Sequence, residues 1–325
     1  MEKIKFLTMA ALATAFFASC SNEDGLPQSN YPADNVVRIT TSIDGMNTRA
    51  SYGGSTAKLS SFGFCINNAG SDKYTYDNIK VTQENGKWNP ATQMLWQNST
   101  TPVDILAYAP YQANGNVKIF GKSDYAFSVK ADQSNAEDYL SDLIVYKQTG
   151  FTPGSELNTS KAVNVAFTHL LSQLNLTIEL RDQFNQDEKK PVTEATVTDV
   201  KVNGTIISSK VDFSASPISV QVDDTQEATA ITPETTEFKA AGKTTDHAAF
   251  NYSAIVIPQT VTAGNFSISF KVDGTDYIWT STSDVNFVSG NKHQLSLLVG
   301  KDVVQVKGIT ATPWGKENIT QGETD

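Results

Sequence analysis

The chain has 325 residues, with 35 acidic and 25 basic side chains and a formal net charge of −10. This acidic balance, without any basic cluster, argues against a nucleic-acid partner, because a phosphate backbone is bound by clustered Lys and Arg. After residue 19 no apolar run reaches the ~18 residues that a membrane-spanning helix needs, so a helical membrane domain is not expected.

Residues 1–19 have the anatomy of a signal peptide. Two lysines precede a mostly apolar stretch, residues 6–17, which is too short to cross a bilayer as a stable helix. Cys20 follows two small residues, at the position where a mature lipoprotein begins. We therefore expect acylation of Cys20, which would anchor the protein to a membrane through its lipid. A plain secretory signal with a chance cysteine is the alternative.

The first expected strand lies beyond a polar tether. Residues 20–35 are rich in Ser, Asn, Asp and Pro, and they show no apolar periodicity. In residues 36–43, Val37, Ile39 and Ile43 share one face at the period of a strand. We therefore predict a strand at residues 36–43.

The segment that follows, RASYGGS at residues 49–55, is small and glycine-rich around Arg49. An exposed loop of this composition is a preferred site of proteolytic cleavage, here by a protease of trypsin-like specificity. An ordinary solvated arginine is the alternative interpretation of Arg49.

From Leu59 onward, short runs rich in β-formers alternate with turn residues, and no helical apolar stripe appears. This pattern predicts an all-β chain. Residues 134–139 are the expected helical turn. In the first half, strands are expected at residues 61–66, 103–107, 117–120, 125–129 and 143–146.

The second half gives clearer signals. Asn203-Gly204 and Asp273-Gly274 each lie between apolar runs and predict two hairpins, over residues 200–207 and 266–279. Residues 223–247 are polar and predict a long loop. Further strands are expected at residues 174–180, 254–257, 295–299 and 303–311.

The length suggests two domains. Removal of residues 1–19 leaves 325 − 19 = 306 residues, enough for two ordinary domains. Residues 147–161 have the clearest loop composition in the middle of the chain. We therefore expect an N-terminal domain at residues 36–160 and a C-terminal domain at residues 161–325.

No motif for catalysis, cofactor binding or metal binding is present, and none of these is expected. His169, His247 and His293 are widely separated, with no second ligand at a metal-binding spacing. Asp138 and Asp142 could share a helical face, but a pair of this kind arises by chance in so acidic a chain. We therefore expect a protein that is not an enzyme.

The tryptophans allow two interpretations. Exposed aromatic faces bind sugars, so Trp88, Trp96, Trp279 and Trp314 allow a glycan-binding surface lipoprotein. Core packing is the stronger interpretation, since Trp96 and Trp279 lie beside or within strand-like runs. Cys65 lies in an apolar run and is expected to be a buried hydrophobe rather than a nucleophile.

Five short stretches follow one another along most of residues 36–315. They are LW at residues 95–96 with VDILAYAPY at 103–111, DYLSDLIV at 138–145, FTHLLSQL at 167–174, IVIPQTV at 255–261 and ITATPW at 309–314. In this order they resemble strand ends and loop motifs of the fimbrillins, the pilus subunits of Bacteroidales, particularly their minor-fimbrium-like branch.

The resemblance implies two tandem β-sandwich domains of transthyretin-like kind, exported as an outer-membrane surface lipoprotein and built into a fimbrium that supports cell adhesion. Residues 21–24 also resemble the acidic export tags of such lipoproteins. The implied partners are other fimbrial subunits, either copies or paralogues, the outer membrane through the lipid, and host or bacterial surface receptors or glycans.

In such assembly one subunit's strand fills a groove in another. The removable strand would be residues 36–43, with Val37, Ile39 and Ile43, and cleavage would separate Arg49 from Ala50. The apolar candidates for a donor strand are Val303, Val304, Val306 and Ile309. The same stretch would also serve as the protein's own last strand, so shaft, tip and anchor roles stay open.

Overall fold

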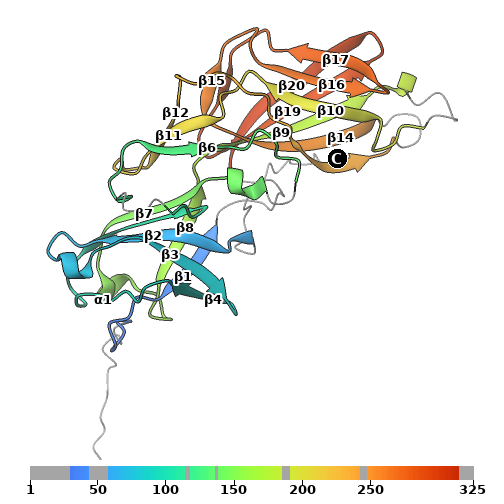
Figure 1. Cartoon of the computed structure of the whole chain (residues 1–325). Coiled ribbons are helices and arrows are strands. Elements are labelled where there is room, and N and C mark those ends of the chain that lie inside the picture. Colours follow the sequence, from blue (N-terminus) through green and yellow to red (C-terminus); the bar gives the residue numbers. More distant parts are fainter. Residues whose placement is uncertain are drawn as a thin grey trace, which may run out of the picture.

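The computed structural model describes residues 30–43, 58–113, 118–135, 138–184, 191–241 and 247–314. Cys20, Arg49 and Ala50, the expected lipidation and cleavage residues, lie outside these ranges. The described chain is almost entirely β-structure, as predicted (Figure 1).

Strands of the first half form one seven-stranded sheet in the order β1-β8-β7-β5-β2-β3-β4. Its connections contain three one-turn helices, η2 (Asp72–Tyr74), η3 (Asp138–Ser141) and α1 (Pro153–Glu156). The strands are β1 (Ile39–Ile43), β2 (Ser61–Asn67), β3 (Tyr76–Glu84), β4 (Lys87–Pro90), β5 (Val103–Ala109), β7 (Ile144–Phe151) and β8 (Val163–His169).

This sheet folds over itself between β7 and β8, which are joined by only two residue pairs, Ile144 with His169 and Val145 with Thr168. The fold brings β8 across the sheet onto β2, where the rings of Phe62 and Phe167 pack edge to face, with 5.4 Å between their centroids. The apolar face of β1 and β8 is therefore buried against the other strands of the same sheet.

Strands of the second half form a five-stranded sheet, β13-β14-β9-β19-β20, a three-stranded sheet, β10-β16-β17, and the pair β15-β18. One 3-10 turn, η4 (Asp182–Phe184), follows β9. The strands are β9 (Ser172–Leu180), β10 (Val197–Asn203), β13 (Glu234–Lys239), β14 (Ala248–Val256), β15 (Gln259–Val261), β16 (Ser267–Val272), β17 (Thr275–Thr280), β18 (Val285–Phe287), β19 (Asn291–Gly300) and β20 (Val303–Pro313).

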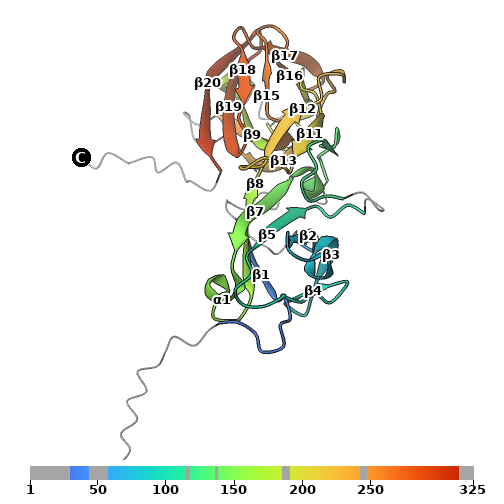
Figure 2. The same ribbon diagram turned by 90° about the vertical axis from the view of Figure 1, so that its left-hand side faces the viewer.

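A small sheet, β12-β11-β6, joins the two parts of the chain. Its strand β6 (Tyr125–Ser128) comes from the first half and pairs antiparallel with β11 (Ser208–Asp212), which also pairs with β12 (Ser219–Val222). In both views the blue-to-green part and the yellow-to-red part are stacked end to end (Figures 1 and 2), and Figure 1 shows β6 and β11 near their junction. The expected boundary near residue 160 remains a proposal.

Most strand predictions are confirmed. The hairpin at Asp273-Gly274 joins β16 to β17, and both turn residues have positive φ, 48° and 81°. Its two-residue turn needs a left-handed backbone at both positions, which Asp and Gly tolerate. The apolar run that ends before Pro258 is the buried end of β14, and β19 and β20 form the last hairpin.

The hairpin predicted at Asn203-Gly204 is wrong. β10 ends at Asn203 but pairs with β16, and the next strand, β11, begins only at Ser208. Gly204 has a φ of 91°, and a Cβ there would lie 2.0 Å from the carbonyl oxygen of Asn265. The glycine therefore allows a close backbone approach rather than a tight turn between neighbours.

Three further expectations need correction. Residues 118–120 form no strand, because the backbone amides of Ile119 and Phe120 donate to the carboxylate of Asp77 instead of to a neighbouring strand. The helical turn expected at residues 134–139 begins instead at residue 138, as η3. The supposed loops at residues 147–161 and 223–247 contain the end of β7, helix α1 and strand β13.

Candidate functional site

The predicted first strand is an edge strand of the seven-stranded sheet. β1 pairs in parallel with β8 along its whole length, from Ile39 with Val163 to Ile43 with Phe167. Val37, Ile39 and Ile43 point into the core, with exposed fractions of 3%, 7% and 7%. The three residues chosen from their period thus occupy one buried face.

Hydrogen bonds fix the chain just before β1. The guanidinium of Arg38 donates to the carboxylate of Asp34 over 2.6 Å, and the backbone amide of Val36 also donates to it. The pKa of Asp34 is lowered to about 2, mainly by the hydrogen bond from Arg38 and further by the one from the Val36 amide. The backbone amide of Val37 donates to the carbonyl oxygen of Met94.

A groove of about 790 Å³ lies between β1 and β4, the two edges of the sheet. Trp88 of β4 bridges it, since its indole N–H donates to the hydroxyl of Thr41 over 3.0 Å. Two edge strands therefore bound the groove. Polar and apolar residues line it together, namely residues 36–41, 83, 86–90, 160 and 162.

The predicted donor residues lie at another sheet edge. β20 is the last strand of the five-stranded sheet and pairs with β19 from Asn291 with Pro313 to Gly300 with Val303. The side chain of Val304 is half-buried against the core. The other three candidates are exposed, Val303 at 44%, Val306 at 46% and Ile309 at 43%.

The tryptophans are packed into the fold. Trp96 is 2% exposed and stacks on Phe151, and Trp314 is 8% exposed. Trp88 and Trp279 are half-buried, and Trp88 packs edge to face on Phe62. These contacts favour core packing over an open stacking platform for sugars. The fully buried thiol of Cys65 has a pKa raised well above its usual value by desolvation, as expected for a structural cysteine.

Two polar side chains that lie outside every sequence motif connect the halves of the chain. Lys147 on β7 donates from Nζ to three carbonyl oxygens of the loop after β11, those of residues 213–215, over 2.7–3.0 Å. Gln133 exchanges two hydrogen bonds with the backbone of Ile255, one in each direction. Neither residue belongs to a motif, so only the structure reveals these contacts.

The sequence also did not predict a buried contact between a histidine and an aspartate. His169 Nδ1 lies 2.9 Å from a carboxylate oxygen of Asp142, and both side chains are at most 1% exposed. The sequence placed the two residues in separate motifs, and only the pairing of β7 with β8 brings them together.

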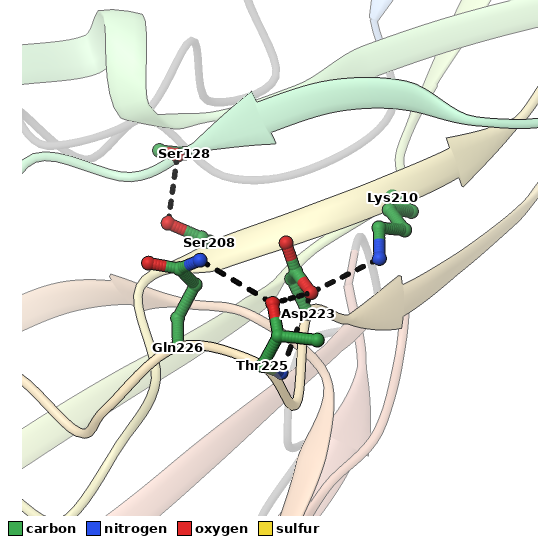
Figure 3. Close-up of polar contacts among 6 residues, drawn as sticks. All are labelled: Ser128, Ser208, Lys210, Asp223, Thr225 and Gln226. Atoms are coloured by element: carbon green, nitrogen blue, oxygen red, sulfur yellow. Dashed lines mark hydrogen bonds and ion pairs between the residues drawn. The ribbon is translucent and has the colours of Figure 1, made fainter.

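Polar side chains of the small joining sheet and of the loop after β12 contact one another at the surface. Asp223 accepts from Lys210 over 3.0 Å and from the hydroxyl of Thr225 over 2.8 Å, and Ser128 donates to Ser208 (Figure 3). The Thr225 and Lys210 contacts lower the pKa of Asp223. In Figure 3 these side chains form hydrogen bonds and an ion pair with one another along the sheet.

Within the described ranges, no group of three or more His, Cys, Asp or Glu side chains is placed to hold a metal ion. Among the same residues, no helix is long and apolar enough to cross a membrane.

Comparison with known families decides the assignment. Residues 48–314 match the family described as fimbrillin-like. The chain belongs to the fimbrillin-like family. The matched residues include most of the strands described above, and the match supports the fimbrial role predicted from the sequence. No curated protein matches the chain in sequence.

Solved structures share this fimbrillin-like fold at low sequence identity. A Bacteroides ovatus protein with a proposed role in cell adhesion matches with a TM-score of 0.60 and 13% identity, over 87% of this chain and 99% of its own. A Bacteroides uniformis protein with the same proposed role matches with a TM-score of 0.55 and 19% identity, over 87% and 99%. A fimbrial protein from Bacteroides vulgatus matches with a TM-score of 0.52 and 16% identity, over 86% and 99%.

Proposed function

We propose that this protein is a fimbrial subunit that assembles by β-strand complementation and supports cell adhesion. The observation that carries the proposal is β1, an edge strand that, with Val37 just before it, places three apolar side chains in the core and ends at Ile43, six residues before Arg49. Its partners are other fimbrial subunits, either copies of this chain or paralogues.

In this proposal, cleavage between Arg49 and Ala50 separates β1 from the rest of the subunit. Loss of β1 would uncover one edge of β8 together with the apolar side chains beneath it. Burial of three large aliphatic side chains is worth about 5–9 kcal/mol in total, so an empty groove is strongly unfavourable. An incoming strand would satisfy the β8 backbone and the exposed core together.

The donor segment is proposed to be β20, with Val303, Val304, Val306 and Ile309. Three of these side chains are exposed where they now lie, so transfer into an apolar groove would bury surface that the isolated subunit leaves in water. β20 is also an edge strand, so it can leave its sheet by breaking the ladder on one side only.

Before cleavage, acylated Cys20 would hold the subunit on the outer membrane, and residues 20–35 would form the tether. Cleavage after Arg49 would release lipid, tether and β1 in one step. A subunit that keeps Arg49 intact would keep its lipid as a final anchor.

The test is limited trypsin treatment of the purified mature chain, followed by electrophoresis and electron microscopy. Polymer ladders and fibres are expected from the wild type and not from Arg49→Gln, which removes the cleavage site without touching the described core. Ladders of equal intensity from both proteins would refute the role of Arg49. Absence of ladders from cleaved wild-type protein would refute assembly by this route.

A surface glycan-binding lipoprotein is the competing hypothesis, in which Trp88 would grip polysaccharide. The packing of Trp88 on Phe62 and its bond to Thr41 favour a structural role. Glycan affinity that is lost in Trp88→Ala, with polymer formation unchanged, would favour this alternative.

A further inference from the structure

Three of the motifs that carry the fimbrillin resemblance meet in one buried cluster. Trp314 follows β20, His169 ends β8, and Asp142 follows η3. The indole of Trp314 lies flat on the imidazole of His169, with 3.9 Å between ring centroids and 6° between planes. The imidazole is held in turn by Asp142, 2.9 Å from Nδ1.

The cluster is closed to solvent. The side chains of His169 and Asp142 are 1% and 0% exposed, and Trp314 as a residue is 8% exposed. The backbone amide of Trp314 donates to the carbonyl oxygen of Gly290 over 2.7 Å. Among the described residues its indole N–H finds no acceptor, so stacking and burial hold the ring rather than a side-chain hydrogen bond.

The rest of β20 contributes little burial. Along its 11 residues only Val304 and Thr312 are half-buried, and the others are exposed. The strand is therefore held by its ladder with β19, by two exposed side-chain contacts, Lys307 with Glu179 and Gln305 with Arg181, and by the buried ring that follows it. The ladder also contains an irregularity opposite Ser296 and Leu297, where the pairing passes over Lys307.

The topology determines where separation of β20 must begin. At the Val303 end, a two-residue turn ties β20 covalently to β19. That end of the hairpin cannot move apart by more than the turn allows. Peeling must therefore start at the Pro313 end, where Trp314 is buried on His169.

We propose that Trp314, seated on the His169–Asp142 pair, is a latch that retains β20 in its own subunit and controls its release to a neighbour. Asp142 acts as a positioning residue, because its bond to Nδ1 fixes the plane on which the indole stacks. The control of release rests on the proposed donor role of β20, whereas retention of the strand does not.

The experiment is native-state hydrogen exchange on the full mature chain. In Trp314→Ala the β20 amides that bond to β19 should exchange about 100-fold faster, because loss of a buried aromatic ring removes the main side-chain anchor of the strand. The matched control is Trp96→Ala, which removes another buried indole, one that stacks on Phe151 in the other part of the chain. It should leave β20 exchange unchanged.

Milder variants keep the test decisive if Trp314→Ala does not fold. Trp314→Phe retains part of the stack, and Asp142→Asn retains the shape of the carboxylate, so each should accelerate β20 exchange about 10-fold while the fold persists. Exchange of β20 that stays at the wild-type rate in the folded variants, or that rises equally in Trp96→Ala, overturns the latch.

Polymer formation separates the latch from the donor role. In Trp314→Ala, faster β20 exchange together with faster ladder formation after trypsin supports both. Faster exchange with no ladder from variant or wild type supports retention by the latch but refutes the donor role and with it the control of release.

Discussion

The separability of β1 can be tested by truncating one buried side chain. Ile39 is 7% exposed and lies on an edge strand that pairs on one side only. Ile39→Ala removes buried methyl groups at a cost of about 2–5 kcal/mol. Because β1 lies at the edge, we expect this cost to lower the free energy of local opening of β1 rather than that of unfolding the whole chain. A cost of about 2 kcal/mol or more raises the equilibrium constant for opening by at least roughly 30-fold.

Hydrogen exchange of β1 and β8 in the uncleaved protein measures this opening. Their amides should exchange faster in Ile39→Ala, while those of β9 and β14 keep the wild-type rate. Ile278→Ala is the matched control, since Ile278 is 63% exposed and its truncation should change stability by less than about 0.5 kcal/mol. If β1 in Ile39→Ala exchanges only together with the core strands, β1 is not separable and the reasoning fails.

The other predictions concern the junction and the pH response. Lys147→Met leaves the carbonyl oxygens of residues 213–215 without their ammonium donor and should lower the free energy of unfolding by about 1.5–3 kcal/mol in urea titrations; an unchanged midpoint would contradict the role of Lys147. Gln133→Ala leaves the buried N–H and C=O of Ile255 without a side-chain partner and should cost about 1–3 kcal/mol, against no change in Gln221→Ala, an exposed control on β12. Burial lowers the pKa of His293 below 6.5, so below that pH the unfolded chain takes up a proton that the folded chain does not. The free energy of unfolding should therefore fall as the pH drops from 6.5 towards the pKa of His293 in the folded chain. If His293→Gln shows the same pH dependence of stability as the wild type, the dependence comes from another group.

Local pattern predicted the strands well, because alternation reports which face of a strand meets a core. Val37, Ile39 and Ile43 show this directly, since their spacing alone identified the buried face of β1 and of the residues just before it. The same logic placed the turn at Asp273-Gly274, where both residues need a positive φ. A pattern of this kind needs no knowledge of the partner strand.

Partner choice could not be predicted from the same patterns. Asn203-Gly204 has the composition of a tight turn, yet Gly204 serves a close approach to Asn265, far along the chain. The parallel pairing of β1 with β8 and the pairing of β6 with β11 likewise join distant segments. Such contacts depend on topology, which periodicity does not encode.

The motifs behind the family resemblance prove to be structural. Asp142, His169 and Trp314 form the buried cluster described above, and Gln259 of the IVIPQTV stretch exchanges hydrogen bonds with both backbone groups of Ile206. These residues hold strand ends and junctions together. They therefore identify the fold, and they carry no information about which receptor or subunit the protein meets.

The central claim is that β1 leaves the subunit when a fimbrium forms. Mass spectrometry and N-terminal sequencing of subunits isolated from assembled fibres test it most directly. We predict an N-terminus at Ala50, with residues 36–43 absent and the β8 amides still protected from exchange by a strand from a neighbour. Fibre subunits that begin at a lipid-blocked Cys20 and retain β1 would contradict the account.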